Sequence, residues 1–197
     1  MFHEIGMMYI TLLPIAFTGV VNAIFCRSSF LDVLHVPIDN GKKLKDGRRL
    51  FGANKTWKGF LGSFVICALL NAIWGKICLR FKGMENWNYM YIYFDNTVAY
   101  NLFTGFLFGF VYAVLELPNS FIKRRMDISS GKQGKGGFGF LFKIYDQIDS
   151  LIGVILVVAL YSKMNITTYM LYVAVGGITH VAINTMLFKL KLRNSIL

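Results

Sequence analysis

Long apolar runs, almost free of charged residues, recur five times along the chain. A transmembrane helix needs about 20 predominantly apolar residues. The charge-free run 150–162 is too short by itself, so the fourth span must begin earlier and include Asp146 and Asp149. The pattern predicts an all-α integral membrane protein with about five transmembrane helices. These spans fall near residues 5–26, 59–79, 96–116, 145–162 and 164–188.

Composition agrees with a membrane protein, because 55% of the 197 residues are hydrophobic and only 16% are charged. Soluble domains usually carry about 25% charged residues. Neither an internal repeat nor a soluble domain stands out, so residues 1–197 are expected to form a single membrane domain. Its two long polar loops are predicted at 27–58 and 117–144. Pro118 is expected to end the third span, and the glycine-rich stretch 131–139 is expected to be a flexible loop.

The net charge of +11 is distributed unevenly between the two sides of this layout. Seventeen of the 21 Lys and Arg residues fall in 27–58, 118–145 and 189–193, and four fall on the other side. Loops rich in Lys and Arg stay in the cytoplasm. We therefore expect a multi-pass protein of the cell membrane with its N-terminus outside, its functional face in the cytoplasm and no nucleic-acid partner.

The first candidate cluster is DGRRLFGANKTWKG, residues 46–59. Gly47, Gly52, Lys55 and Thr56 suggest phosphate binding, because glycines free backbone N–H groups and a helix N-terminus attracts anions. The spacing is not that of a P-loop, in which Lys directly follows the second Gly. The alternative is a basic stretch that touches anionic lipid headgroups.

The second cluster is ELPNSFIKRR, residues 116–125. Asn119 and Ser120 offer amide and hydroxyl groups at the membrane interface. Three cations follow them, and these either hold phosphate groups or anchor the helix by the positive-inside rule. Glu116 is either a third metal ligand or an acid that reaches the interface. The three cations are Lys123, Arg124 and Arg125.

The third cluster is the acidic pair Asp146 and Asp149, which share one face of a helix because they are three residues apart. Mg²⁺ commonly takes one or two carboxylates together with substrate phosphates. The alternative is a solvated helix start, where acidic residues complement the helix dipole. Together the three clusters would provide metal-assisted transfer between phosphates at one cytoplasmic interface. His180, within the fifth span, is interpreted as a packed or hydrogen-bonded residue in preference to a ligand.

Read in order, three segments resemble the CDP-archaeol synthase family of membrane CTP-dependent cytidylyltransferases, which are related to phosphatidate cytidylyltransferase. The segments are PIDNGKKLKDGRRLFGANKTWKGFLG (37–62), ELPNSFIKRR (116–125) and DQIDSLIG (146–153). The length and the five-span layout also match. The resemblance implies that a lipid phosphate attacks the α-phosphorus of CTP, giving a CDP-activated lipid and pyrophosphate with Mg²⁺ as cofactor.

The resemblance also assigns roles to individual residues. Asp146 and Asp149 would be catalytic metal ligands, with Lys123 and Arg124 as catalytic cations. The remaining residues would bind the substrates. They are Gly52, Asn54, Lys55, Thr56, Glu116, Asn119, Ser120 and Arg125.

Two departures distinguish the chain from the phosphatidate branch. Ser129 and Ser130 occupy the places of a Lys-Asp pair, and Gln147 follows Asp146. Both favour the archaeol-type branch, although activity on a diacyl substrate stays open. The other alternative is a small lipid or ion transporter, which would place its polar groups near mid-membrane. The sequence leaves the oligomeric state open, with a homodimer as one option.

Overall fold

A computed structural model describes residues 2–130 and 136–191, and the side chains of all of these except residues 136–144. Five α-helices are long and apolar enough, by length and composition, to cross a membrane. The prediction of an all-α membrane protein with about five spans is therefore confirmed. The helices are α1 (Phe2–Arg27), α2 (Trp57–Arg80), α3 (Val98–Arg125), α4 (Gly136–Ser162) and α5 (Ile166–Lys189).

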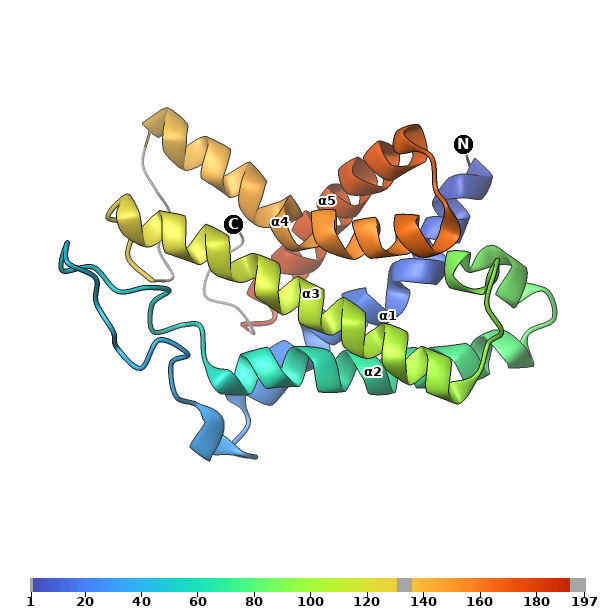
Figure 1. Cartoon of the computed structure of the whole chain (residues 1–197), viewed down its shortest axis with the longest axis horizontal. Helices are drawn as coiled ribbons and strands as arrows, with labels where there is room; N and C mark the ends of the chain where they lie inside the picture. The colour runs from blue at the N-terminus through green and yellow to red at the C-terminus, as the bar shows by residue number, and fades with distance from the viewer. Residues whose placement is uncertain (1, 131–135, 192–197) are drawn as a thin grey trace.

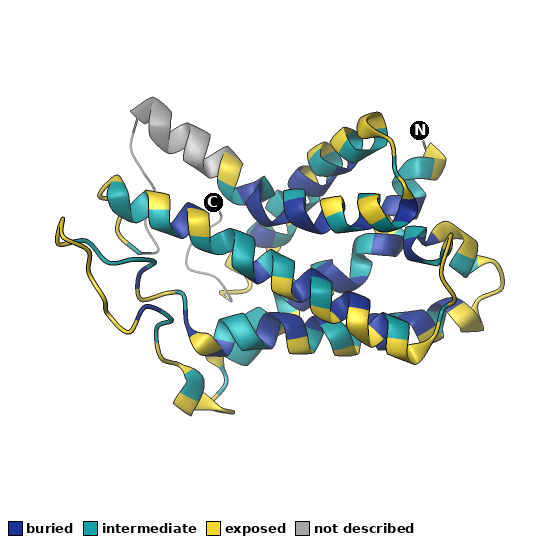
Figure 2. Ribbon diagram, in the orientation of Figure 1, coloured by how far each residue is buried: buried dark blue, intermediate teal, exposed yellow. Residues whose placement is uncertain are grey.

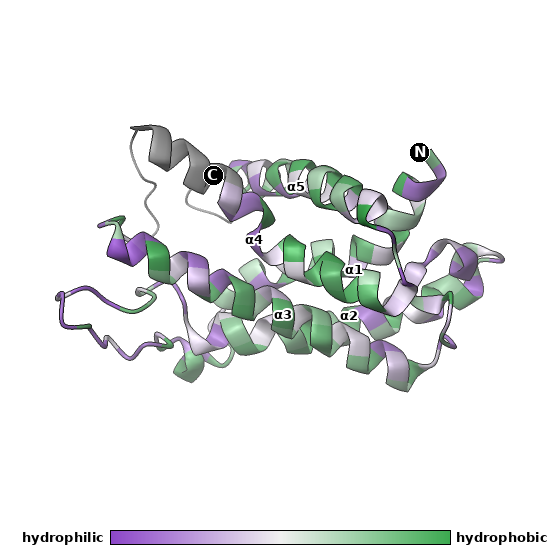
Figure 3. Cartoon of the chain, turned by 45° about the horizontal axis from the view of Figure 1, so that its top comes forward, coloured by the Kyte–Doolittle hydropathy of each residue, from purple (hydrophilic) through white to green (hydrophobic). Residues whose placement is uncertain are grey.

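The helices lie side by side with their polar connections at the two ends of the bundle (Figure 1). One end holds the loop between α1 and α2, which includes the 3₁₀ helix η1 (Asp32–Leu34), and the C-terminal end of α3. The other end holds the N-terminus of α1 and the α2–α3 connection with η2 (Met84–Trp87) and η3 (Tyr89–Tyr91). Figure 3 shows hydrophobic residues concentrated between these two hydrophilic ends. This distribution is the one expected of a chain that spans a bilayer.

Helices α2 and α3 make the most extensive helix–helix contact. Small residues permit it, because a Cβ on Gly109 would lie 2.4 Å from the Cα of Phe64 and one on Gly105 would lie 2.7 Å from the Cα of Ala68. Glycines four residues apart let helix backbones approach closely in membranes. The amide of Asn71 adds hydrogen bonds of 2.9 Å to Asn101 O and to Thr104 Oγ1. Close packing and buried hydrogen bonds thus join the two helices along their length.

Large apolar side chains are exposed on the helices, and Figure 2 shows exposed positions recurring along each helix. Leu69, Ile73 and Phe103 are each more than half exposed. In water such a surface would promote aggregation, whereas in a bilayer it contacts lipid tails at no cost. The buried core lies between the helices and includes Phe108 and Val154, both fully buried.

Two expectations about helix ends are wrong. Pro118 lies inside α3, which continues to Arg125. A proline removes one backbone hydrogen bond, and neighbouring helices compensate for this loss within membranes. Here the turns after Pro118 are held to α4 by side-chain contacts of Asn119 and Lys123.

The start of α4 also differs from expectation. The helix begins at Gly136, so residues 136–139 are helical, whereas the rest of the expected glycine-rich loop, residues 131–135, lies outside the described residues. The pair Asp146 and Asp149 consequently lies well inside α4. Stabilisation of a helix start therefore does not explain these two carboxylates. Lys132, Lys135 and Arg193, which contribute to the charge distribution, also lie outside the described residues.

Candidate active site at the polar end of the bundle

The residues before α2 are held by a short antiparallel pairing with residues 36–38. Ile38 N donates to Lys55 O at 2.8 Å, and Trp57 N donates to Val36 O at 2.9 Å. The Thr56 hydroxyl caps α2 by accepting from Gly59 N at 3.3 Å. This local structure places Lys55 and Thr56 at the N-terminus of α2, where the helix dipole favours anions.

Lys55 forms an ion pair with Glu116 on α3. The two side chains are 28% and 31% exposed, so both remain accessible to a ligand. The contact joins residues that are 61 positions apart in the sequence. The first and second sequence clusters therefore meet in space.

Asn119 joins the second cluster to the acidic pair. Its amide nitrogen donates to Asp146 Oδ1 at 2.5 Å and to Asp149 Oδ2 at 2.6 Å. Asp146 also pairs with Lys123, and Asp149 accepts from Ser150 N at 2.6 Å. Asp149 is buried, so its carboxylate depends on these donors. The polar faces of α3 and α4 thus enclose two carboxylates, one amide and one ammonium group.

The residue types of this group suit a divalent cation, and the Asn119 amide would present its oxygen to the two carboxylates once turned over about its Cβ–Cγ bond. Asn119 Oδ1 is buried and has no hydrogen-bond partner, while two carboxylates share the adjacent amide nitrogen. Hard cations such as Mg²⁺ bind carboxylate and amide oxygens and keep other positions for water or phosphate. Within the described part of the chain, no three His, Cys, Asp or Glu side chains form a metal-binding group. A cation here would therefore need ligands from a substrate as well.

The two arginines at the end of α3 point to different partners. Arg124 donates to Ser130 Oγ at 3.2 Å, and its Nε is buried without a hydrogen-bond partner. Arg125 binds both carboxylate oxygens of Asp46, at 2.7 and 2.9 Å, and also donates to the carbonyl of Arg49. The structure thus brings Arg125 to the α1–α2 loop and Arg124 to Ser130, and the Nε of each arginine is a buried donor without a hydrogen-bond partner.

Gly52 lies directly against Arg124 and Ser130. Its φ of +105° favours glycine, and a Cβ would lie 2.2 Å from Ser130 Oγ and 3.5 Å from Arg124 Nε. Ser120, also expected at the site, is buried on α3. The backbone of the candidate phosphate loop therefore lies against Ser130, just beyond the cationic end of α3.

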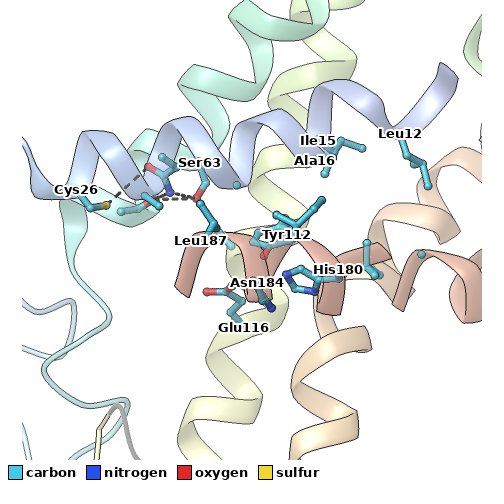
Figure 4. A pocket seen from close by; sticks show the side chains of 18 of the residues that line it. Leu12, Ile15, Ala16, Cys26, Ser63, Tyr112, Glu116, His180, Asn184 and Leu187 are labelled. Carbon is cyan, nitrogen blue, oxygen red and sulfur yellow. Dashed lines mark hydrogen bonds between the residues drawn. The ribbon is translucent and has the colours of Figure 1, made fainter. Parts of the chain in front are cut away.

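A cavity of about 400 Å³ runs beside this polar group. Figure 4 shows Cys26 and Ser63 on the wall formed by α1 and α2, with Tyr112, Glu116 and Asn184 on the facing wall formed by α3 and α5. Apolar side chains line most of its remaining length. They include Met8, Leu12, Leu13, Ile15, Ala16, Ala23, Leu151 and Leu187. Asn54, Lys55 and Thr56 line the cavity where it approaches the start of α2.

His180 also lines the cavity. Its Nδ1 lies 2.9 Å from the carbonyl oxygen of Gln147, so it is a hydrogen-bonded residue between α4 and α5, as the sequence analysis favoured. Asn184 donates to Gln147 Oε1 at 2.8 Å. Gln147, which distinguishes the chain from the phosphatidate branch, therefore supports the cavity wall.

Sequence reasoning did not single out Asp39. Its carboxylate is inaccessible to solvent and pairs with Arg49. Burial opposes ionisation of Asp39. Hydrogen bonds from Arg49 and from three backbone N–H groups outweigh burial and hold the pKa of Asp39 well below its usual value. The glycines at positive φ that follow it, Gly41 and Gly52, were the available signal for a folded loop.

Lys58 was missed as well. It is fully buried in the first turn of α2, and its ammonium donates to Ser28 O at 2.6 Å and lies 5.3 Å from the centre of the Phe25 ring. A cation in the first turn of a helix is unfavourable because it opposes the helix dipole. The position of Lys58 in the sequence was therefore a signal that a specific partner holds its ammonium group. The contact fixes the end of α1 against the start of α2.

These features define a class of protein: a membrane-embedded enzyme with phosphate-binding cations and paired carboxylates next to an apolar cavity. The family model for CarS-like CDP-archaeol synthase matches residues 8–196, and the chain belongs to this family. It is therefore a CTP-dependent cytidylyltransferase that makes a CDP-activated lipid from a nucleotide and a lipid phosphate. Enzymes of this class generally use a divalent metal. Family membership supports this activity over the transporter alternative.

Individual relatives agree with the family assignment. The CDP-archaeol synthase of Pyrococcus abyssi is 38% identical over 130 residues, 64% of this chain and 69% of that protein. That of Archaeoglobus fulgidus is 29% identical over 161 residues, 80% of this chain and 82% of that protein. That of Pyrococcus furiosus is 35% identical over 114 residues, 53% of this chain and 56% of that protein.

One solved structure, described as an intramembrane enzyme for archaeal membrane lipid biosynthesis, has the same fold. The two structures superpose over 90% of this chain and 92% of the other chain, with a TM-score of 0.57 and 22% sequence identity. The five-helix arrangement is therefore one that an intramembrane enzyme adopts.

Proposed function

We propose that this enzyme transfers the cytidylyl group of CTP to the phosphate of an archaeol-type lipid at the polar end of the bundle, with Mg²⁺ as the metal. The observation that carries the proposal is the Asn119 amide that bridges Asp146 and Asp149 while Lys55 and Glu116 pair at the adjoining end of an apolar cavity. Cations for phosphates, oxygens for a metal and an apolar wall for a lipid thus adjoin one another.

Each polar residue then has a role. Asp146 and Asp149, with the unpaired oxygen of Asn119, would hold Mg²⁺, which neutralises phosphate charge when bound. Lys55, Thr56 and the backbone N–H groups around Gly52 and Asn54 would bind CTP phosphates at the start of α2. Lys123 and Arg124 would stabilise the charge that develops during transfer, since preorganised donors act most strongly on the transition state.

The reaction forms one bond and breaks another at the α-phosphorus of CTP. An oxygen of the lipid phosphate attacks this phosphorus, and the bond to the bridging oxygen of the β-phosphate breaks. Pyrophosphate leaves with that oxygen and its electron pair. The lipid phosphate is already anionic, so no protein base is needed to activate it. Positioning and electrostatic stabilisation are the contributions expected of the protein.

The lipid would lie in the cavity between α1 and α5. Glu116 and Asn184 are near its polar part, and the apolar side chains of α1 provide the surface for a hydrocarbon tail. Pockets of this kind bury most of their ligand against apolar walls and orient it through a few polar groups. The lipid phosphate would then lie at the polar end of this cavity, beside the phosphates of CTP.

The polar end is proposed to face the cytoplasm, with the N-terminus of α1 outside. The distribution of Lys and Arg supports this orientation, and CTP is a cytoplasmic nucleotide. A homodimer stays a prediction from the sequence.

The test is an assay of the purified protein with labelled CTP, Mg²⁺ and a panel of lipid phosphates that varies ether against ester linkages and prenyl against acyl tails. A labelled CDP-lipid formed with the ether-linked prenyl substrate would support the proposal. Preferential use of diacyl phosphatidate would overturn the choice of lipid. The Asp146→Asn variant is the negative control.

A further inference from the structure

The loop between α1 and α2 is organised around one buried carboxylate, that of Asp39. Its Oδ1 accepts from Gly41 N at 3.0 Å. Its Oδ2 accepts from Gly52 N at 2.9 Å and from Phe51 N at 3.2 Å. Arg49 contacts both oxygens through its guanidinium group. Three backbone N–H groups and one guanidinium therefore converge on a side chain that is inaccessible to solvent.

These contacts fix the segment that precedes α2 from one side. The Asp39 carboxylate holds Gly52, and the neighbouring Ile38 holds Lys55 through its backbone N–H. Lys55 N also donates to Gly52 O at 3.3 Å, which closes a turn between the two anchoring points. The proposed phosphate-binding residues 52–56 are thus attached at both ends to residues 37–39.

The same contacts place Gly52 against Arg124. Gly52 adopts a φ of +105°, and its backbone lies so close to Ser130 that a Cβ would be 2.2 Å from Ser130 Oγ, while the same Cβ would be 3.5 Å from Arg124 Nε. Arg124 keeps its Nε free of a hydrogen-bond partner next to this contact. A shift of Gly52 would therefore move the backbone of the phosphate loop and disturb Ser130, which accepts a hydrogen bond from Arg124.

We infer that Asp39 is a positioning residue of the cytidylyltransferase site: it sets residues 52–56 and Arg124 in the geometry that binds the phosphates of CTP without touching the nucleotide. The inference rests on the proposed assignment of this loop to CTP. It assigns Asp39 no contact with the lipid, because the cavity and the acidic pair are formed by other residues.

Asp39→Asn is the direct test, since it keeps the shape but directs an amide N–H₂ group at backbone donors. We expect KM for CTP to rise about ten- to hundredfold, with KM for the lipid phosphate changed less than twofold. The matched control is Asp127→Asn. Asp127 also pairs with a loop arginine, Arg48, but its side chain is 73% exposed and it holds no backbone N–H of residues 52–56. This control should leave both KM values near those of the wild type.

A second measurement separates positioning from general loss of folding. Equilibrium binding of CTP with Mg²⁺ should weaken in Asp39→Asn by the same factor as KM rises, while the helix content in detergent stays at the wild-type value. Equal rises in KM for CTP and for the lipid phosphate, or an effect no larger than that of Asp127→Asn, would overturn the inference. If the wild type itself fails to bind CTP, the proposed site is wrong, and this outcome is distinct from a failure of Asp39 alone.

Discussion

The ammonium group of Lys55, one residue before the N-cap of α2, pairs with the carboxylate of Glu116 on α3. The pair lies where the cavity reaches the phosphate loop, and both residues line that cavity. A phosphate that enters must compete with Glu116 for Lys55. The pair therefore keeps the lysine oriented toward the site before a substrate arrives.

Replacement of Lys55 by alanine should reduce kcat/KM about ten- to hundredfold, because a charge-assisted contact to phosphate contributes roughly 1.5–3 kcal/mol. Steady-state kinetics with labelled CTP would measure the loss. Lys43→Ala is the control, since Lys43 is exposed on the same loop and should leave activity nearly unchanged. Similar mild losses in both variants would mean that the loop cations act only as a diffuse membrane anchor.

Asp146→Asn and Asp149→Asn should each abolish turnover, because each removes a carboxylate from the group that Asn119 bridges. Activity should be assayed across a Mg²⁺ titration, with folding followed by helix content in detergent. Asp95→Asn, at the opposite end of the bundle, should retain activity. Near-normal turnover in either site variant would remove that residue from the metal site.

Gly19→Leu should reduce binding of the lipid without affecting CTP. Gly19 lines the cavity, and a Cβ there would meet nothing within 4 Å, so a larger side chain can occupy this space. We expect KM for the lipid phosphate to rise about tenfold, equivalent to about 1.4 kcal/mol. Val21→Phe adds bulk at an exposed position of α1 and serves as the control. An unchanged KM in Gly19→Leu would place the lipid elsewhere.

Asp39 should make the stability of the protein depend on pH. Its pKa is lowered in the folded state, so its stabilising contribution is complete above its ordinary value of 3.8 and is lost as the pH falls below that value. Asp39→Asn should therefore lower the free energy of unfolding at pH 7 by roughly 1–3 kcal/mol. The difference in Tm between the two proteins in detergent should narrow from pH 5 to pH 3. A constant difference across this range would contradict the assignment.

The orientation of the chain can be checked by cysteine labelling in a cysteine-free background. A Lys82→Cys variant, in the connection between α2 and α3, should react with an impermeant maleimide in intact cells. Lys43→Cys should react only after lysis. Both positions are exposed, so access to the reagent depends on the side of the membrane. The reverse pattern would invert the topology and place the polar site outside.

The five helices could be predicted because membrane insertion depends on local hydropathy, which is a property of the sequence alone. The position of Pro118 could not be interpreted correctly in this way. Its helix continues because Asn119 and Lys123 contact α4, and such contacts depend on the fold. Asp39 was overlooked for a similar reason, since three of its donors lie 10–13 residues further along the chain.

Part of the candidate site could be predicted from the sequence. Residue types and their order indicated phosphate and metal chemistry, and the structure brings Lys55 to Glu116 and Asn119 to the acidic pair. The sequence could not show that Arg125 binds Asp46 in the α1–α2 loop while Arg124 binds Ser130. Adjacent residues on a helix point in different directions, and the element that each meets is set by tertiary structure.

The close contact at Gly105 and Gly109 fixes the distance between helices α2 and α3. The proposed phosphate loop leads directly into α2, and Lys123 and Arg124 lie at the end of α3. The separation between these two groups of cations is thus set by backbone contact deep in the membrane, at glycines that do not line the proposed lipid cavity. A methyl group added at Gly109 would push against the backbone of α2 and move the two helices apart, together with the cations at their ends. Selection for catalysis at the membrane surface should therefore act on glycines buried well below it.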